Sequence, residues 1–125
     1  MKKVIHTDNA PKAVGPYSQA VKMGDFLFCS GQISIDPKTN EVFTGDIKIQ
    51  TEMVMKNVEA VLAAADMNFS NVIKTTIFIT NMADFATVNE VYAKSFTAAP
   101  PARSTVAVAG LPKGVNVEIE VVAHR

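Results

Sequence analysis

The sequence predicts an α+β fold in which two helices cover one face of a mixed β-sheet. Three observations favour this class. Apolar and β-branched segments indicate strands in three parts of the chain, two other segments carry apolar residues at helical spacing, and turn-forming residues separate them. The order is therefore strands, helix, strand, helix, strands. The length of 125 residues suits one domain that spans residues 1–125.

The first half of the chain predicts a hairpin and a helix. Residues 20–23 and 26–29 read as two strands joined by the tight turn Gly24-Asp25, and residues 36–40 form a loop. From Asp46 to about residue 65, apolar side chains recur at helical spacing. Asp46 follows a glycine and is in position to cap this helix.

The second half predicts a strand, a helix and two further strands. Residues 71–80 form a β-branched strand, and a helix follows from about residue 83 to 98, ended by Pro100 and Pro101. Residues 103–109 and 115–123 are strands. Read as a simple hairpin, they would pair Arg103 near residue 121, about 10 Å along the strand from Glu118.

The last strand alternates cleanly, with Val117 and Ile119 on one face and Glu118 and Glu120 on the other. Two helices cannot cover both sides of the sheet, yet its strands are too apolar for an open surface. We therefore expect self-association through the sheet.

Composition narrows the classes of function. Twelve basic and twelve acidic residues give a net charge of zero, which does not favour nucleic-acid binding. The N-terminal segment turns polar too early for a signal peptide or a membrane span. The lone Cys29 excludes an internal disulfide and fits a reducing cytoplasm. His6 and His124 lie at opposite ends of the chain, so we expect no metal site, and no dinucleotide or phosphate-loop motif implies a cofactor.

Arg103 and Glu118 are the first candidates for chemistry. Arg103 is the only arginine apart from the C-terminal residue, and it stands among small side chains at the start of a strand. There its planar fork could bind a carboxylate or phosphate, although it could also be an ordinary surface arginine. Glu118 shares a strand face with Glu120, so repulsion could raise one pKa and suit proton transfer. It could equally be an outward-facing surface carboxylate.

Four further residues are weaker candidates. Tyr17 lies in a Gly-Pro turn, and Ser30 follows an apolar strand just before Gly31, where a ligand could approach the main chain closely. Asn89 flanks the apolar stripe of the second helix. Packing, capping or solvation would explain any one of them.

Together these segments resemble the reactive-intermediate deaminase family (RidA, or YjgF) from about residue 3 to 123. The resemblance rests on the motifs Gly15-Pro16-Tyr17-Ser18-Gln19-Ala20, Cys29-Ser30-Gly31-Gln32, Pro101-Ala102-Arg103-Ser104 and Val117-Glu118-Ile119-Glu120-Val121. It implies a chorismate-mutase-like fold and a homotrimer whose sheets face inward, with sites between subunits. It also implies a cofactor-free hydrolysis of enamines and imines, such as 2-aminoacrylate, 2-iminopropanoate and 2-iminobutanoate, to 2-oxo acids and ammonia.

The resemblance also implies roles for the candidate residues. Arg103 would anchor the substrate carboxylate, Glu118 would position water, and Tyr17, Ser30, Gly31 and Asn89 would line the cleft. Thr105 stands where many members have a cysteine, and its backbone could contact substrate. A 2-oxo acid-binding regulatory module of the same fold is the alternative, and a ribonuclease or translation inhibitor fits the charge balance less well.

Overall fold

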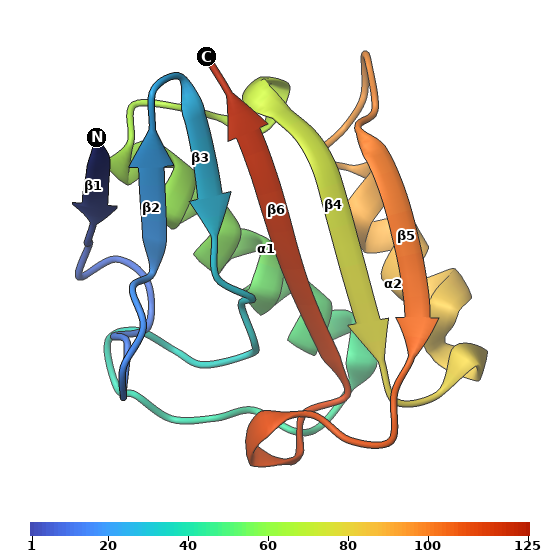
Figure 1. Cartoon of the computed structure of the whole chain (residues 1–125). Helices are drawn as coiled ribbons and strands as arrows, with labels where there is room; N and C mark the ends of the chain where they lie inside the picture. The colour runs from blue at the N-terminus through green and yellow to red at the C-terminus, as the bar shows by residue number, and fades with distance from the viewer.

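The computed structural model describes residues 1–125 and contains one six-stranded sheet, in the order β1-β2-β3-β6-β4-β5 (Figure 1). The strands are β1 (Lys2–Ile5), β2 (Ala20–Met23), β3 (Phe26–Cys29), β4 (Val72–Ile79), β5 (Ala102–Ala107) and β6 (Val117–His124). The helices are α1 (Ile47–Ala64) and α2 (Phe85–Ala93), with short 3₁₀ turns at Phe69–Asn71, Met82–Asp84 and Pro112–Gly114. Only β4 and β5 are parallel, so the sheet is mixed.

Both helices lie on one side of the sheet, behind the strands in Figure 1. The core between the two layers consists of buried aliphatic side chains, including Val54, Val58, Val61 and Leu62 of α1, Val88 of α2, and Ile77, Val117, Ile119 and Val121 of the sheet. The predicted fold class is therefore confirmed. Neither helix has the length and apolarity that crossing a membrane requires.

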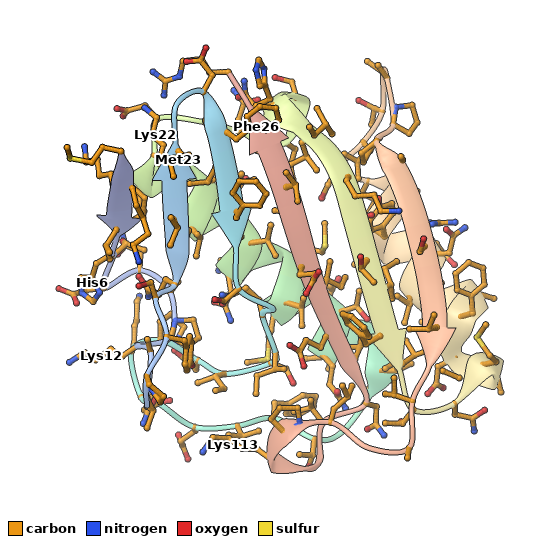
Figure 2. All side chains as sticks on the ribbon, in the orientation of Figure 1. His6, Lys12, Lys22, Met23, Phe26 and Lys113 are labelled. Atoms are coloured by element: carbon orange, nitrogen blue, oxygen red, sulfur yellow. The ribbon has the colours of Figure 1, made fainter.

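The other side of the sheet carries no helix. Met23, Phe26, Phe28 and Val106 remain between 42% and 50% exposed there. Figure 2 shows Met23 and Phe26 together on this open face. The prediction of an apolar sheet face without a covering layer is confirmed.

Most predicted elements occur where the sequence places them. The β2–β3 hairpin has the expected bounds, and Asp46 caps α1 by accepting hydrogen bonds from the backbone N–H groups of Lys48 and Ile49 at 2.7 and 3.2 Å. On β6, Val117 and Ile119 are fully buried, whereas Glu118 and Glu120 lie on the open face.

Two predictions about the second half are wrong. The second helix ends at Ala93 rather than near residue 98, because the chain tightens into i→i−3 hydrogen bonds, among them Phe96 N to Ala93 O at 3.2 Å. This tightening places the Phe96 ring against Tyr92 and Phe69, with centroid separations of 4.7 and 5.4 Å.

The last two strands also do not form a hairpin. β4 lies between β5 and β6, running parallel to β5 and antiparallel to β6. The connection from β5 to β6 therefore crosses the end of β4 instead of turning tightly. In addition, β1 pairs with β2 at the edge of the sheet and was not predicted from the sequence.

Candidate functional site

Arg103 lies on the edge strand β5 and faces the helix side of the sheet. Its register partner on β4 is Thr75, a fully buried residue beneath α2. The guanidinium Nη1 donates a hydrogen bond to Asn89 Oδ1 at 2.6 Å. The structure therefore brings together two of the candidate residues, Arg103 from β5 and Asn89 from α2.

Aromatic rings of α2 support the guanidinium. Its central carbon lies 5.4 Å from the centroid of Phe85 and 5.0 Å from that of Tyr92. Burial raises the pKa of Tyr92, so this ring is neutral at physiological pH, and its hydroxyl is held by Thr75 Oγ1 at 2.7 Å. We call Arg103, Asn89, Phe85 and Tyr92 the arginine cluster.

The charge of Arg103 has no carboxylate partner. The one ion pair in the chain joins His6 and Asp8, far from β5 in the sequence. The side chain of Arg103 makes a single hydrogen bond, to Asn89, although a guanidinium has five N–H donors. A cavity of about 400 Å³ lies beside it. This cluster is equipped to receive a small anion such as a carboxylate.

Glu118 lies on the open face of β6, opposite Phe78 of β4. Burial raises the pKa of its carboxyl above the usual value, and the neighbouring Glu120 raises it further. A carboxyl in this state is closer to accepting and releasing protons near neutral pH than an ordinary glutamate. The repulsion predicted from the Glu118–Glu120 spacing is thus present.

Gly31 packs directly against the Glu118 side chain. A Cβ at position 31 would overlap Glu118 Oε2 and lie only 2.8 Å from Cδ and 2.9 Å from Cγ. Backbone hydrogen bonds between Gln32 and Ile119, at 2.9 and 3.1 Å, fix this segment beside β6. Glycine at position 31 therefore leaves open the space that the Glu118 carboxylate occupies, whereas the sequence alone indicated only that a ligand could approach the main chain there.

The backbone N–H of Gly31 makes no hydrogen bond within the chain. Ser30, in contrast, is fully engaged: its N–H donates to Gln19 O at 2.9 Å and its hydroxyl donates to Ser18 O at 2.6 Å. A ligand beside Glu118 would therefore find a free donor on Gly31, whereas Ser30 holds the main chain in place. We call Glu118, Gly31 and Ser30 the glutamate cluster.

Tyr17 lies on the loop that leads into β2. Its side chain is 54% exposed, and its hydroxyl accepts a long hydrogen bond of 3.4 Å from Val14 N. Through Ser18 and Gln19 this loop is tied to Ser30, as described above. Tyr17 is therefore connected through its chain neighbours to Ser30 of the glutamate cluster, and its ring is exposed.

Gln19 is the residue of this region whose importance the sequence did not reveal. It is only 2% exposed, and its amide makes four hydrogen bonds to the backbone of residues 7–11. The oxygen Oε1 accepts from Thr7 N at 2.7 Å. The nitrogen Nε2 donates to the carbonyls of Thr7, Ala10 and Pro11 at 3.0, 3.4 and 2.8 Å. It thereby anchors the first loop to the segment that carries Tyr17. No spacing or composition signal distinguishes it from a surface glutamine.

The two clusters lie apart within one chain. Arg103 is in register with Thr75 and Val121, whereas Glu118 is in register with Phe78 and Val106, two strands and three residues away. That offset puts their Cα atoms on the order of 14 Å apart, on opposite faces of the sheet. A single chain therefore cannot bring both groups to one small substrate.

Thr105 lies two residues beyond Arg103 on the same side of β5. It does not line the 400 Å³ cavity beside Arg103, and its hydroxyl makes no hydrogen bond in the chain. No group of three or more His, Cys, Asp or Glu side chains is placed to hold a metal ion. Burial raises the pKa of Cys29 to about 12, so this thiol is protonated at physiological pH.

Fold and site together define a small α+β protein with a sparsely hydrogen-bonded arginine beside a cavity on one side of its sheet and a partly buried carboxylate on the other. The family model described as endoribonuclease L-PSP matches residues 7–125. The chain therefore belongs to the RidA/YjgF family, as its motifs indicated, and this family includes reactive intermediate deaminases.

Relatives and solved structures agree along the whole chain. A RutC family protein of Pyrococcus horikoshii is 54% identical over 125 residues, covering 100% of this chain and 99% of that protein. The chloroplastic Reactive Intermediate Deaminase A of Arabidopsis thaliana is 47% identical over 98% of this chain and 65% of its own length. The crystal structure of E. coli TdcF with bound serine is 45% identical, with a TM-score of 0.93 over 98% of both chains.

Proposed function

We propose that this protein hydrolyses 2-imino acids, formed from enamines such as 2-aminoacrylate, to 2-oxo acids and ammonia. The preferred substrates in this proposal are 2-iminopropanoate and 2-iminobutanoate, and the setting is the cytoplasm. The observation that carries the proposal is Arg103: a rigidly supported guanidinium with four unused N–H donors beside a cavity. Family membership and the deaminase relative support the same conclusion.

The proposed chemistry needs only positioning and proton transfer. Arg103 binds the carboxylate of the substrate, and Glu118 takes a proton from water as the oxygen attacks C2 of the protonated imine. The resulting carbinolamine bears the hydroxyl and the amine on C2. Glu118 then returns the proton to nitrogen. As the C–N bond breaks, the carbinolamine hydroxyl gives its proton to Glu118, the C2–O bond becomes a carbonyl, and ammonia leaves. That proton finally passes to the ammonia, which departs as ammonium. One water is consumed for each ammonia released.

We propose further that a homotrimer forms with the sheets facing inward. Two features support it: the apolar open face, which an assembly would bury, and the separation of the two clusters within one chain. In such an assembly, the arginine cluster of one copy would complete a cleft with the glutamate cluster and Tyr17 of the next.

The direct test measures ammonia and 2-oxo acid release from freshly generated 2-aminocrotonate, corrected for spontaneous hydrolysis. Acceleration by the wild-type protein that is lost in Arg103→Ala would support the proposal. Binding of a 2-oxo acid at Arg103 without any acceleration would overturn it in favour of a regulatory module.

The description of the family model raises a ribonuclease as an alternative, but the site does not favour it. The net charge is zero, and neither His6 nor His124 belongs to the arginine or the glutamate cluster. A fluorogenic RNA substrate incubated with the wild-type protein and Arg103→Ala tests this point. Cleavage by the wild-type protein alone would reinstate the alternative.

A further inference from the structure

A second cavity lies along α1, well apart from both clusters. Its volume is about 750 Å³, within the range of small-molecule sites. Its lining comes from α1, from residues 8–9 and 35–38, and from residues 67–68, and it shares no residue with the arginine or glutamate cluster. Because α1 lies on the helix side of the sheet, association through the open face would leave this cavity accessible (Figure 1).

The lining contains a buried polar side chain with an unused acceptor. Asn57 is 3% exposed, and its Nδ2 donates to the backbone carbonyls of Ile33 and Ile35 at 3.1 and 2.9 Å. These two bonds fix the amide with its oxygen on the other side. No group in the chain donates to Asn57 Oδ1, and the atom is not sealed from solvent. A molecule in the cavity would meet an acceptor that calls for an N–H or O–H donor.

The rim of the cavity carries both signs of charge. Lys38 and Lys56 have no ion-pair partner, and neither do Asp36 and Glu59; a third acidic residue of the lining, Asp8, pairs with His6 at 3.2 Å. Such a rim suits a zwitterion better than a simple anion or cation, since each end of the zwitterion finds opposite charge.

The walls between these charges are apolar. Ile35, Met53, Ala60, Ala63 and Met67 line the cavity, and the two methionines can adapt to side chains of different shape. A ligand with an apolar body would bury it here and gain the hydrophobic contribution.

We infer that this cavity is a binding site for a free apolar α-amino acid. The ammonium group donates to Asn57 Oδ1, the carboxylate lies near Lys38 or Lys56, and the side chain packs on Met53 and Met67. The inference does not depend on the proposed deaminase activity, because it involves none of the residues of the two clusters.

The experiment uses the methionine methyl groups as reporters. The protein is labelled with [¹³C-methyl]methionine and titrated with L-leucine up to about 10 mM, a range that detects millimolar dissociation constants. Met53 and Met67 signals should shift saturably, whereas those of Met23 and Met82, outside the cavity, should not. The same titration on Arg103→Ala should give the same result, which separates this site from the arginine cluster.

Three analogues test the recognition groups separately. 4-Methylpentanoate lacks the ammonium group, 3-methylbutylamine lacks the carboxylate, and glycine lacks the apolar side chain. Each should bind at least about tenfold more weakly than L-leucine, a loss of about 1.4 kcal/mol. Equal binding of 4-methylpentanoate would overturn the role of Asn57 Oδ1.

A matched pair of alanine variants tests the location. Ala63 and Ala64 are neighbours on α1 and both are exposed, but only Ala63 lines the cavity. Ala63→Phe should project an aromatic ring into the cavity and weaken L-leucine binding at least about tenfold, whereas Ala64→Phe should bind as the wild type does. Unchanged binding in Ala63→Phe, or no saturable shift of Met53 and Met67 in the wild type, would overturn the inference.

Discussion

Replacing Gly31 by alanine separates the placement of the Glu118 carboxylate from the stability of the fold. The new Cβ would overlap Oε2 and approach Cδ to 2.8 Å, closer than real side chains tolerate. The backbone beside it is held by the Gln32–Ile119 bonds, so the flexible carboxylate has to move, by on the order of 1 Å. A displacement of that size at a reacting group lowers a rate by about 10²-fold, which corresponds to about 2.7 kcal/mol of activation free energy.

Stability should change little in the same variant. Gly31 does not have a positive φ, so alanine is compatible with the backbone, and the only atoms displaced belong to the end of a flexible side chain. The loss of glycine entropy in the unfolded chain even favours folding slightly. We therefore expect a large loss of kcat with a thermal midpoint close to that of the wild type.

The assay is initial-rate ammonia release from 2-aminocrotonate, together with thermal unfolding of the same preparations. Gly110→Ala is the matched control, because Gly110 also lacks a positive φ and a Cβ there meets nothing within 4 Å. It should keep both the rate and the midpoint. Near-normal turnover by Gly31→Ala would refute the idea that the position of Glu118 governs the reaction.

Other perturbations test the remaining parts of the site. Arg103→Ala should lose most of the activity and Arg103→Lys should recover little of it in kcat/KM measurements, since a point charge cannot replace the planar fork; full recovery by lysine would contradict the bidentate anchor. The pKa of Glu118 is higher in the folded than in the unfolded protein, so ionisation of this carboxyl at pH 7 opposes folding. Glu118→Gln should therefore raise the thermal midpoint at pH 7. It should not raise the midpoint below about pH 4, where the carboxyl is protonated in both states. A midpoint gain that persists at low pH would point to packing instead. Gln19→Met should reduce the free energy of unfolding by about 2–3 kcal/mol, because backbone groups of residues 7–11 lose their hydrogen-bond partners. Urea titrations at fixed protein concentration measure this change. An unchanged urea midpoint would mean that water replaces the amide. Phe28→Lys on the open face should yield monomers in sedimentation velocity, with no deaminase activity, and an active monomer would remove the proposed cleft between copies.

The sequence predicted those elements whose signals are local. The alternation of β6 predicted that Glu118 and Glu120 share one face and that Val117 and Ile119 share the other, and the structure buries the aliphatic face. The α1 start was equally clear, since Asp46 satisfies two backbone donors that the helix leaves open. In both cases one short segment contained all the information needed.

The failures concern features that depend on distant segments. Strand β5 consists mostly of small or exposed residues, so no alternation reveals that Arg103 faces the helices. Its parallel partner β4 lies some 30 positions earlier in the sequence, and only this pairing excludes the hairpin with β6. Strand β1 has two lysines among four residues and exists because β2 offers it an edge.

The separation of Arg103 and Glu118 has an electrostatic consequence for the proposed mechanism. If both stood on one face of one chain, the guanidinium and the carboxylate would pair, which would lower the pKa of Glu118 and occupy the donors of Arg103. Within one chain the sheet separates the two groups and prevents this pairing. The pKa of Glu118 therefore stays raised, and the guanidinium of Arg103 keeps unused N–H donors beside the neutral rings of Phe85 and Tyr92. In the proposed assembly, where Arg103 of one copy would meet Glu118 of the next, the substrate carboxylate would neutralise the arginine and so keep it from lowering the pKa of Glu118.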